Sequence, residues 1–176
     1  GKKRKDALVN HEIDIAESIS NMYYQNLSNI SEITLKMVTP PSVNYLVLDF
    51  REYDSSGFPN QKNPLSDIRV RKALYHAINT QQIINETCSH PRFAPPATQY
   101  VTPLIFGYNP NISRLPYDLN QSQKLLNEAG YPNGVDIDFY TATNRYVNDR
   151  QSSQAIVPML NAFGPALYAT HTQEEV

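Results

Sequence analysis

The second half of the chain contains a complete set of signals for a helix, a turn and a half-buried strand. Asp118 can accept a hydrogen bond from the first turn of a helix, and Gln121 stands three residues later, the spacing of a capping box. Gly130 can adopt the left-handed conformation that ends a helix, and Pro132 prevents the helix from continuing. In residues 135–140 apolar and polar side chains then alternate, which predicts a strand with one buried face. A helix joined to such a strand favours an α/β fold.

A second helix is predicted after the Asn63-Pro64 turn. Pro64 disfavours the helical conformation for its predecessor, and Ser66 or Asp67 can cap the helix that follows. Side chains suited to one buried face then recur at helical spacing over residues 70–84. The spacing predicts a single helix whose inward stripe consists of Val70, Ala73, Leu74, Ala77, Ile78, Gln81 and Ile84.

Shorter segments extend the alternation of helices and strands. Period-two patterns and β-branched runs predict strands at 33–37, 43–50 and 166–170, and helical spacing predicts helices at about 4–10, 20–29 and 149–163. Ile13 and Ile15 are expected to enter a short buried segment, and Pro158 is expected to kink or shorten the last helix. The proline-rich stretch 89–116 is predicted to be an ordered loop, a kind of segment that is usually functional or packed over another part of the molecule.

Composition limits the partners and the class of protein. A chain of 176 residues suits one domain with its own core. The formal net charge of −2 gives no basic field for nucleic acid or an anionic membrane. Cys88 is the single cysteine, so the chain cannot form an internal disulfide.

The cysteine, histidine and acidic residues of this sequence do not show the spacing of a known kind of catalytic or metal site. Cys88 and His90 are close in sequence, but this adjacency is not the geometry of a nucleophile and its base. Asp136 and Asp138 lie two apart on a predicted strand, so both are expected on its solvent face. The four histidines show no metal-binding spacing, and we expect no metal ion or cofactor. A hydrolase built on Cys88 or on the acidic pairs remains an alternative to a non-enzymatic role.

Several segments resemble, in the same order, motifs of extracellular solute-binding protein family 5, which serves oligopeptide, dipeptide and nickel ABC importers. Residues 67–74 are similar to the motif D-x-R-V-R-x-A-L. Residues 117–134 are similar to Y-D-x-x-x-A-x-x-L-L-x-E-A-G-Y-P-x-G, and 143–156 to x-N-R-Y-x-N-D…A-Q-A-I. Two further matches lie at 7–17, where His11 replaces the family glycine, and at 103–110. Together the matches span roughly residues 7–164.

The resemblance implies a fold and a transport function. The fold implied is the C-terminal lobe of a periplasmic-binding-protein type II fold, with a mixed sheet flanked by helices. Residues 1–176 are then expected to form a single, incomplete lobe of a two-lobed receptor whose N-terminal lobe is missing from this sequence. Such a receptor would capture peptides in the periplasm, or outside the cell at the membrane, and deliver them to an ABC permease. Nickel chelates and other solutes stay open as ligands.

The loop 144–149 is the predicted ligand site. It joins the carboxyl end of a strand to a helix N-terminus, where open α/β sheets bind their ligands. Arg145 can hold a carboxylate, Tyr146 can stack and donate a hydrogen bond, and Asn144 can pair with a peptide group. The structural alternative pairs Arg145 with a nearby acid and buries Tyr146, with Asp149 as a helix cap. Tyr45 is a further candidate, because its strand approaches the lobe junction in the family.

A different use of the same fold also stays open. Ligand-sensing domains of transcription regulators can share it, and the near-neutral charge does not separate a sensor from a transport receptor. An adjoining helix-turn-helix in the same gene would favour the regulator.

Overall fold

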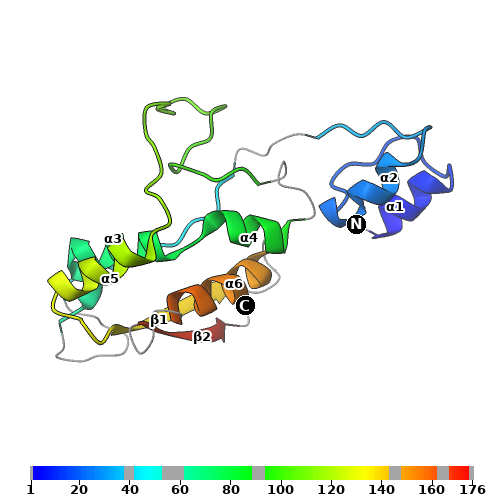
Figure 1. Cartoon of the computed structure of the whole chain (residues 1–176). Coiled ribbons are helices and arrows are strands. Elements are labelled where there is room, and N and C mark those ends of the chain that lie inside the picture. The colour runs from blue at the N-terminus through cyan, green and yellow to red at the C-terminus, as the bar shows by residue number, and fades with distance from the viewer. Residues whose placement is uncertain are drawn as a thin grey trace.

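The computed structural model describes residues 2–37, 42–52, 62–88, 94–142, 148–161 and 167–174. Most of its helices and both of its strands form one α/β body, from which the N-terminal helices and a long loop stand apart (Figure 1). None of the helices in these ranges is both long and apolar enough to cross a membrane.

The order of elements follows the predicted alternation. The N-terminal part contains α1 (Lys2–Val9), the 3₁₀ turn η1 (Asn21–Tyr23) and α2 (Tyr24–Ser28). The α/β body contains η2 (Pro64–Ser66), α3 (Ile68–Ala77), α4 (Thr80–Thr87), α5 (Leu119–Glu128), β1 (Val135–Ala142), α6 (Asp149–Asn161) and β2 (Leu167–Glu174). The helix predicted between Asp118 and Gly130 and the helices predicted at about 4–10 and 20–29 are confirmed, as is the strand at 135–140. The helix predicted at 149–163 and the strand predicted at 166–170 are confirmed over their described residues, 149–161 and 167–170. The described part of the 89–116 stretch, from residue 94 onward, contains no helix or strand, as predicted.

The two strands pair in parallel and α6 connects them. The register runs from Val135 opposite Leu167 to Ala142 opposite Glu174. A parallel pair needs a crossover, and α6 supplies it while packing on both strands. The described residues thus form a βαβ unit with helical cover. They contain this parallel pair and no antiparallel partner that would make the sheet mixed.

The core lies between α3, α5, α6 and β1. Val70, Ala73 and Ala77 of α3 and Leu126 of α5 have no exposed surface. The hydroxyl of Ser122 donates to the carbonyl oxygen of Ala73 at 2.7 Å, so a buried polar contact joins the two helices. The other apolar members of this core are Leu65, Leu74, Leu125, Val135, Ile156 and Leu160.

The start of α5 matches its prediction, but one helix face differs. Asp118 accepts a hydrogen bond from the Gln121 backbone N–H at 2.9 Å, and Gly130 has a φ of +91°. Helical spacing would place Leu119 on the same inward face as Leu126, seven residues later, yet Leu119 is 39% exposed. Leu119 is the first residue of α5, where the backbone N–H of its neighbour Asp118 already donates to the His76 carbonyl oxygen of α3 at 3.0 Å, so its exposure comes from the direction of the side chain.

The single helix predicted over residues 70–84 is two helices in the structure. The break falls at Ile78 and Asn79, where the side chain of Asn79 accepts a hydrogen bond from the Gln82 backbone N–H at 3.1 Å. An asparagine cap competes with continuation of the helix, because it satisfies one of the backbone donors that a new helix start exposes. The cap at Asn79 therefore ends one helix and starts another, although the apolar spacing continues through this point.

The strands predicted at 33–37 and 43–50 do not form in the structure. These residues belong to no sheet, although Leu48 packs against the core. A strand needs a partner for its backbone groups, and neither described strand pairs with these segments. The buried segment expected at Ile13 and Ile15 is also wrong, since these side chains are 36% and 87% exposed.

Asn63 fixes the 42–52 segment to the α/β body. Its side-chain amide donates to the carbonyl oxygens of Asp49 and Arg51 at 2.8 and 2.9 Å. Its side-chain oxygen accepts from the Leu65 N–H at 2.9 Å. Asn63 is 5% exposed, so these bonds satisfy a buried amide. The backbone at 49–51 is thereby held against η2 and the start of α3.

Candidate functional site

The predicted ligand loop lies at the carboxyl end of β1. Asn144, Arg145 and Tyr146 fall outside the described residues, but both flanks of the loop are described. β1 ends at Ala142 and α6 begins at Asp149, so the loop joins the end of a parallel strand to the start of a 13-residue helix. This is the connection that the sequence predicted, and it is where open α/β sheets place ligands.

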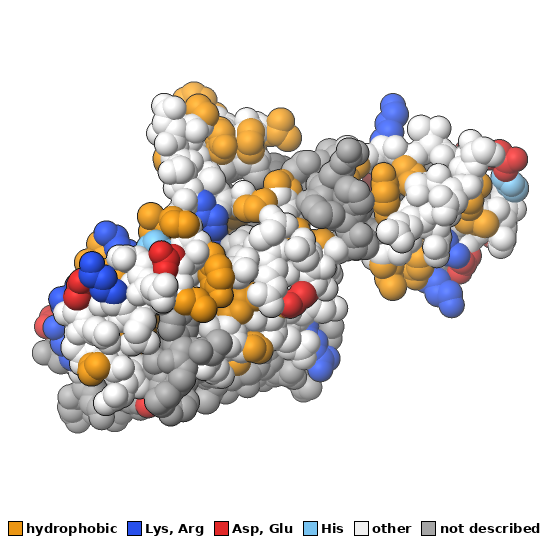
Figure 2. Space-filling view, in the orientation of Figure 1, with side chains coloured by type: hydrophobic (Ala, Val, Ile, Leu, Met, Phe, Trp, Pro, Cys, Tyr) orange, Lys and Arg blue, Asp and Glu red, His pale blue; other side chains and the backbone are white. Residues whose placement is uncertain are grey.

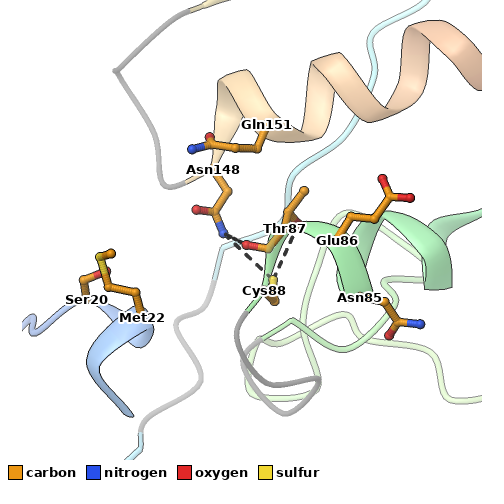
Figure 3. A pocket seen from close by; sticks show the side chains of 8 residues that line it. All are labelled: Ser20, Met22, Asn85, Glu86, Thr87, Cys88, Asn148 and Gln151. Atoms are coloured by element: carbon orange, nitrogen blue, oxygen red, sulfur yellow. Dashed lines mark hydrogen bonds between the residues drawn. The ribbon is translucent and has the colours of Figure 1, made fainter. Parts of the chain in front are cut away.

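A hollow of about 540 Å³ lies beside the C-terminal flank of this loop (Figure 3). The end of α4 and the start of α6 contribute most of its walls, and the N-terminal segment contributes the rest. Most of the lining side chains can form hydrogen bonds, and Glu86 is the one carboxylate among them. The lining residues are Ser20, Met22, Asn85, Glu86, Thr87, Cys88, Asn148 and Gln151.

Asn148 holds the two main walls together. Its φ is +61°, a left-handed conformation that asparagine tolerates better than most residues. Its side-chain amide donates to the Thr87 carbonyl oxygen at 2.8 Å. Its own carbonyl oxygen accepts the Ser152 N–H at 2.9 Å, the first bond of α6. The Thr87 carbonyl oxygen, at the end of α4, has no partner within its own helix, and Asn148 supplies one. The same residue accepts the first backbone hydrogen bond of α6.

Cys88 is half-buried at the end of α4, between Thr87 and Asn148. Its sulfur lies 3.7 Å from the Thr87 hydroxyl and 3.9 Å from the Asn148 amide nitrogen (Figure 3). His90, the base considered with Cys88, lies outside the described residues. Within those residues, no group of three or more His, Cys, Asp and Glu side chains could hold a metal ion.

Asp149, predicted to cap the helix from outside it, lies in the first turn of α6, and Asn148 is the residue before the helix. Asp149 is the first residue of the helix, and its carboxylate accepts the Arg150 N–H at 2.7 Å. Ser153, one turn later, is buried and its hydroxyl lies 2.6 Å from that of Thr141 on β1. These contacts fix the helix start against the strand end, so both ends of the ligand loop are anchored.

Tyr45 lies apart from this hollow. Its ring is 59% exposed and meets the ring of Tyr100 edge to face, with centroids 4.9 Å apart and planes at 84°. It does not line the hollow beside Asn148. A second, smaller hollow of about 330 Å³ runs along residues 47–51, close to Tyr45 in sequence. The described residues therefore do not bring Tyr45 together with the walls at Asn148.

The sequence prediction missed the two residues that organise the hollow. Asn148 was seen only as part of a motif, and Thr87 was not considered. An asparagine directly before a helix that follows a strand is a signal for a left-handed residue and could have indicated Asn148. No pattern in the sequence connects Ser20 and Met22 with α4, because their contribution depends on how the chain folds over a long distance.

Comparison with known proteins agrees with this architecture. The family model described as "Bacterial extracellular solute-binding proteins, family 5 Middle" matches residues 2–168. The heme-binding protein A of Haemophilus influenzae is 33% identical over 112 residues, which cover 64% of this chain and 20% of that protein. The dipeptide-binding protein of Escherichia coli K12 is 29% identical over 119 residues, covering 68% of this chain and 21% of that protein.

A solved structure extends the likeness to nearly the whole chain. It is the periplasmic binding protein DppA from Helicobacter pylori, associated with an ABC transporter and in complex with the peptide STSA. The match has a TM-score of 0.69 at 25% identity and covers 99% of this chain but 31% of that protein. This chain therefore spans between about a fifth and a third of the length of these relatives. With the fold of a type II periplasmic binding protein and a family match over residues 2–168, the chain belongs to family 5 of the bacterial extracellular solute-binding proteins.

Proposed function

We propose that this chain is the C-terminal lobe of an ABC-importer receptor that captures peptides outside the cytoplasm and delivers them to a membrane permease. One observation carries the proposal: the fold matches a peptide-bound, ABC-transporter-associated binding protein over 99% of this chain. The dipeptide-binding relative from Escherichia coli supports the same ligand class. The family is one of solute-binding proteins, which supports a non-enzymatic role.

The ligand loop has the chemistry that a peptide end requires. Arg145 would hold the ligand carboxylate through two parallel hydrogen bonds, and Asn144 would pair with a peptide group. Tyr146 would stack on a ligand side chain. The N-terminus of α6 adds backbone N–H groups and the positive end of a helix dipole. The polar hollow beside Asn148 would take ligand atoms that extend beyond the loop.

This lobe alone would bind a peptide weakly. Tight small-molecule sites bury most of the ligand surface, and a single open face leaves half of it in water. In the receptor proposed here, an N-terminal lobe closes over the ligand and excludes water. Closure of two lobes around a ligand is a hinge motion, and the closed form would present the surface that the permease recognises.

The test is a calorimetric titration of the full-length gene product with defined peptides of two to five residues. We expect saturable binding, and Arg145→Ala should weaken it at least about tenfold, because a charge-assisted hydrogen bond contributes roughly 1.5–3 kcal/mol. Arg150→Ala is the matched control, since Arg150 is an exposed arginine in the first turn of α6, the helix that follows the ligand loop. It should bind like the unchanged protein.

Other results would revise the proposal in defined ways. Binding of heme or a nickel chelate in place of peptides would keep the receptor role and replace the ligand class, and the heme-binding relative from Haemophilus influenzae makes heme the first alternative to test. Equal losses in Arg145→Ala and Arg150→Ala would mean that the loop acts through general charge and is not the peptide site. Binding of no solute at all would overturn the proposed function.

A further inference from the structure

The turn between α5 and β1 is exposed and closed by a backbone hydrogen bond. The Gly134 N–H donates to the Tyr131 carbonyl oxygen at 3.1 Å, across Pro132 and Asn133. Gly134 has a φ of +92°, which glycine adopts without steric cost. Asn133 is exposed, and its side-chain amide has no hydrogen-bond partner in the described part of the chain. Charged side chains gather at this end of α5 in the space-filling view, so the turn leaves the helix at a solvated surface (Figure 2).

Asn133-Gly134 is the one Asn-Gly pair in the sequence, and such a pair has a particular reactivity. The backbone nitrogen of the residue after an asparagine can reach the side-chain carbonyl carbon and close a five-membered ring. A side chain on that following residue obstructs the approach, and glycine has none. Asn127 shows the contrast: Glu128 follows it within α5, and its side-chain oxygen accepts a hydrogen bond from Gln123 at 3.0 Å. The sequence and the local structure thus concentrate this reactivity at Asn133.

We propose that Asn133 is a site of spontaneous covalent modification, at which the asparagine converts to aspartate and isoaspartate at neutral pH. The Gly134 backbone nitrogen attacks the side-chain carbonyl carbon of Asn133, and the new carbon–nitrogen bond closes an imide ring. The side-chain nitrogen leaves as ammonia and takes the proton that the Gly134 nitrogen loses. Water then opens the ring at one of its two carbonyl groups, which gives aspartate or, with the backbone rerouted through the former side chain, isoaspartate. Water is the only co-reactant, so the proposal does not depend on which ligand the receptor binds.

The hydrogen bond that closes the turn controls the rate. While the Gly134 N–H donates to Tyr131, its proton is held and its nitrogen is less free to attack. At 3.1 Å this bond lies in the upper part of the normal range, and it belongs to an exposed turn at the end of a helix. Opening such a turn costs far less free energy than unfolding the whole protein. The reaction therefore proceeds from the native protein by local opening, and it is slower there than in the unfolded chain.

The products change the chain where it enters β1. Val135, the residue after the turn, is 7% exposed and pairs with Leu167 at the start of the parallel strand pair. Isoaspartate lengthens the backbone by one carbon atom directly before this position, and the buried face of the strand fixes a register that the added atom disturbs. Both products also place a negative charge three residues before Asp136, which is exposed on β1. The modified protein is therefore expected to be less stable than the fresh protein.

Incubation of the full-length gene product at neutral pH and physiological temperature, followed by peptide mapping, tests the proposal. Fragmentation in the mass spectrometer distinguishes asparagine, aspartate and isoaspartate at position 133. We expect both products to accumulate there with time, with isoaspartate in excess, and at least several-fold faster than any product at Asn127. Asn133→Gln is the matched control, because it keeps a side-chain amide but would have to close a larger and less favoured ring. Position 133 should stay unmodified in this variant.

Two further measurements sharpen the result. The same incubation in urea should speed the reaction at position 133 several-fold, because the bond between Gly134 and Tyr131 is then lost. Thermal unfolding after incubation should show a lower midpoint for the unchanged protein and no change for Asn133→Gln. The proposal would be overturned if the native protein stayed unmodified at position 133 while the urea sample reacted, and equally if products at Asn127 formed as fast as those at Asn133. An equal fall in the midpoint of both proteins would overturn the expected effect on β1.

Discussion

The side-chain amide of Asn148 donates to the carbonyl oxygen of Thr87 at 2.8 Å, across 61 positions of sequence. This bond connects the end of α4 with the start of α6, and the hollow beside the ligand loop lies where these two helices meet. Asn148 achieves this while its backbone holds a φ of +61°. The position therefore requires a residue that tolerates a left-handed backbone and also carries an amide.

Two substitutions at Asn148 separate these requirements. Asn148→Gly keeps the backbone conformation at little cost and loses the hydrogen bond, whereas Asn148→Ala loses the bond and keeps a Cβ in the left-handed region without the side-chain amide that makes this conformation tolerable for asparagine. We expect the glycine variant to lose about 1 kcal/mol of unfolding free energy and the alanine variant about 1 kcal/mol more. Urea denaturation of both variants measures the difference. Equal losses would show that backbone strain at this position is negligible.

Ser122 offers a second test of a long-range polar contact. Its fully buried hydroxyl donates to the Ala73 carbonyl oxygen at 2.7 Å, and Ser122→Ala removes that donor inside the core. We expect a loss of about 1 kcal/mol, the usual net value of such a bond. Ser28→Ala is the matched control, because the Ser28 hydroxyl also donates to a backbone carbonyl, that of Gln25, but in an exposed position. Thermal unfolding of Ser28→Ala should match that of the unchanged protein within about 0.5 kcal/mol.

Local signals explain which elements could be predicted from sequence. The helix at 119–128 was predictable because its start at Asp118 and its end at Gly130 are both set by neighbours in the chain. The helix break at Asn79 was not predicted, although its signal is also local, because the apolar period on both sides conceals an asparagine cap. The strand predicted at 43–50 failed for a different reason: β-branched residues favour a strand only where another strand supplies hydrogen-bond partners.

In the candidate site, too, the features set by local sequence could be predicted and those set by packing could not. The strand-to-helix loop that contains Arg145 was placed correctly relative to β1 and α6, because their order in sequence determines it. The contact of Asn148 with Thr87 could not be predicted, since it depends on how α4 packs against α6. Tyr45 was assigned to the ligand by family resemblance, and the structure pairs it with Tyr100, a residue of the long proline-rich loop.

The Asp67–Arg69 pair at the start of α3 predicts a specific pH dependence. Hydrogen bonds from the Arg69 guanidinium, joined by the Arg69 backbone N–H, lower the pKa of Asp67 from 3.8 to about 2. Because the folded-state pKa lies below the unfolded one, the pair stabilises the fold above about pH 4 and loses this contribution as the pH falls toward 2. The side chains are partly exposed, so the contribution should be about 1 kcal/mol or less.

Asp67→Asn isolates this contribution, because asparagine still caps the helix but cannot titrate. The difference in unfolding free energy between the unchanged protein and Asp67→Asn should be largest near neutral pH, should shrink as the pH falls below about 4, and should be lost as the pH falls through about 2. Hydrogen bonds from Arg51 also lower the pKa of Asp49 to about 2. Asp49 is present in both proteins, so its contribution cancels in the difference. A difference that stayed constant from pH 7 to pH 2 would show that the charge of Asp67 contributes nothing.

The contact between α3 and α5 should dominate the stability of the α/β body. Leu126 has no exposed surface and belongs to the core cluster that these helices share with β1 and α6. Leu126→Ala should cost about 2–5 kcal/mol, because it removes buried methylene groups and leaves a cavity that the packed helices cannot fully close. Leu119→Ala, seven residues earlier on the same helix, is the matched control, since Leu119 is 39% exposed and its truncation leaves no enclosed cavity. Urea denaturation should show a large fall in the midpoint for Leu126→Ala and a small one for Leu119→Ala. If the two variants lost equal stability, the core would not be centred on the α3–α5 contact, and the helices would be held mainly by their connections to the sheet.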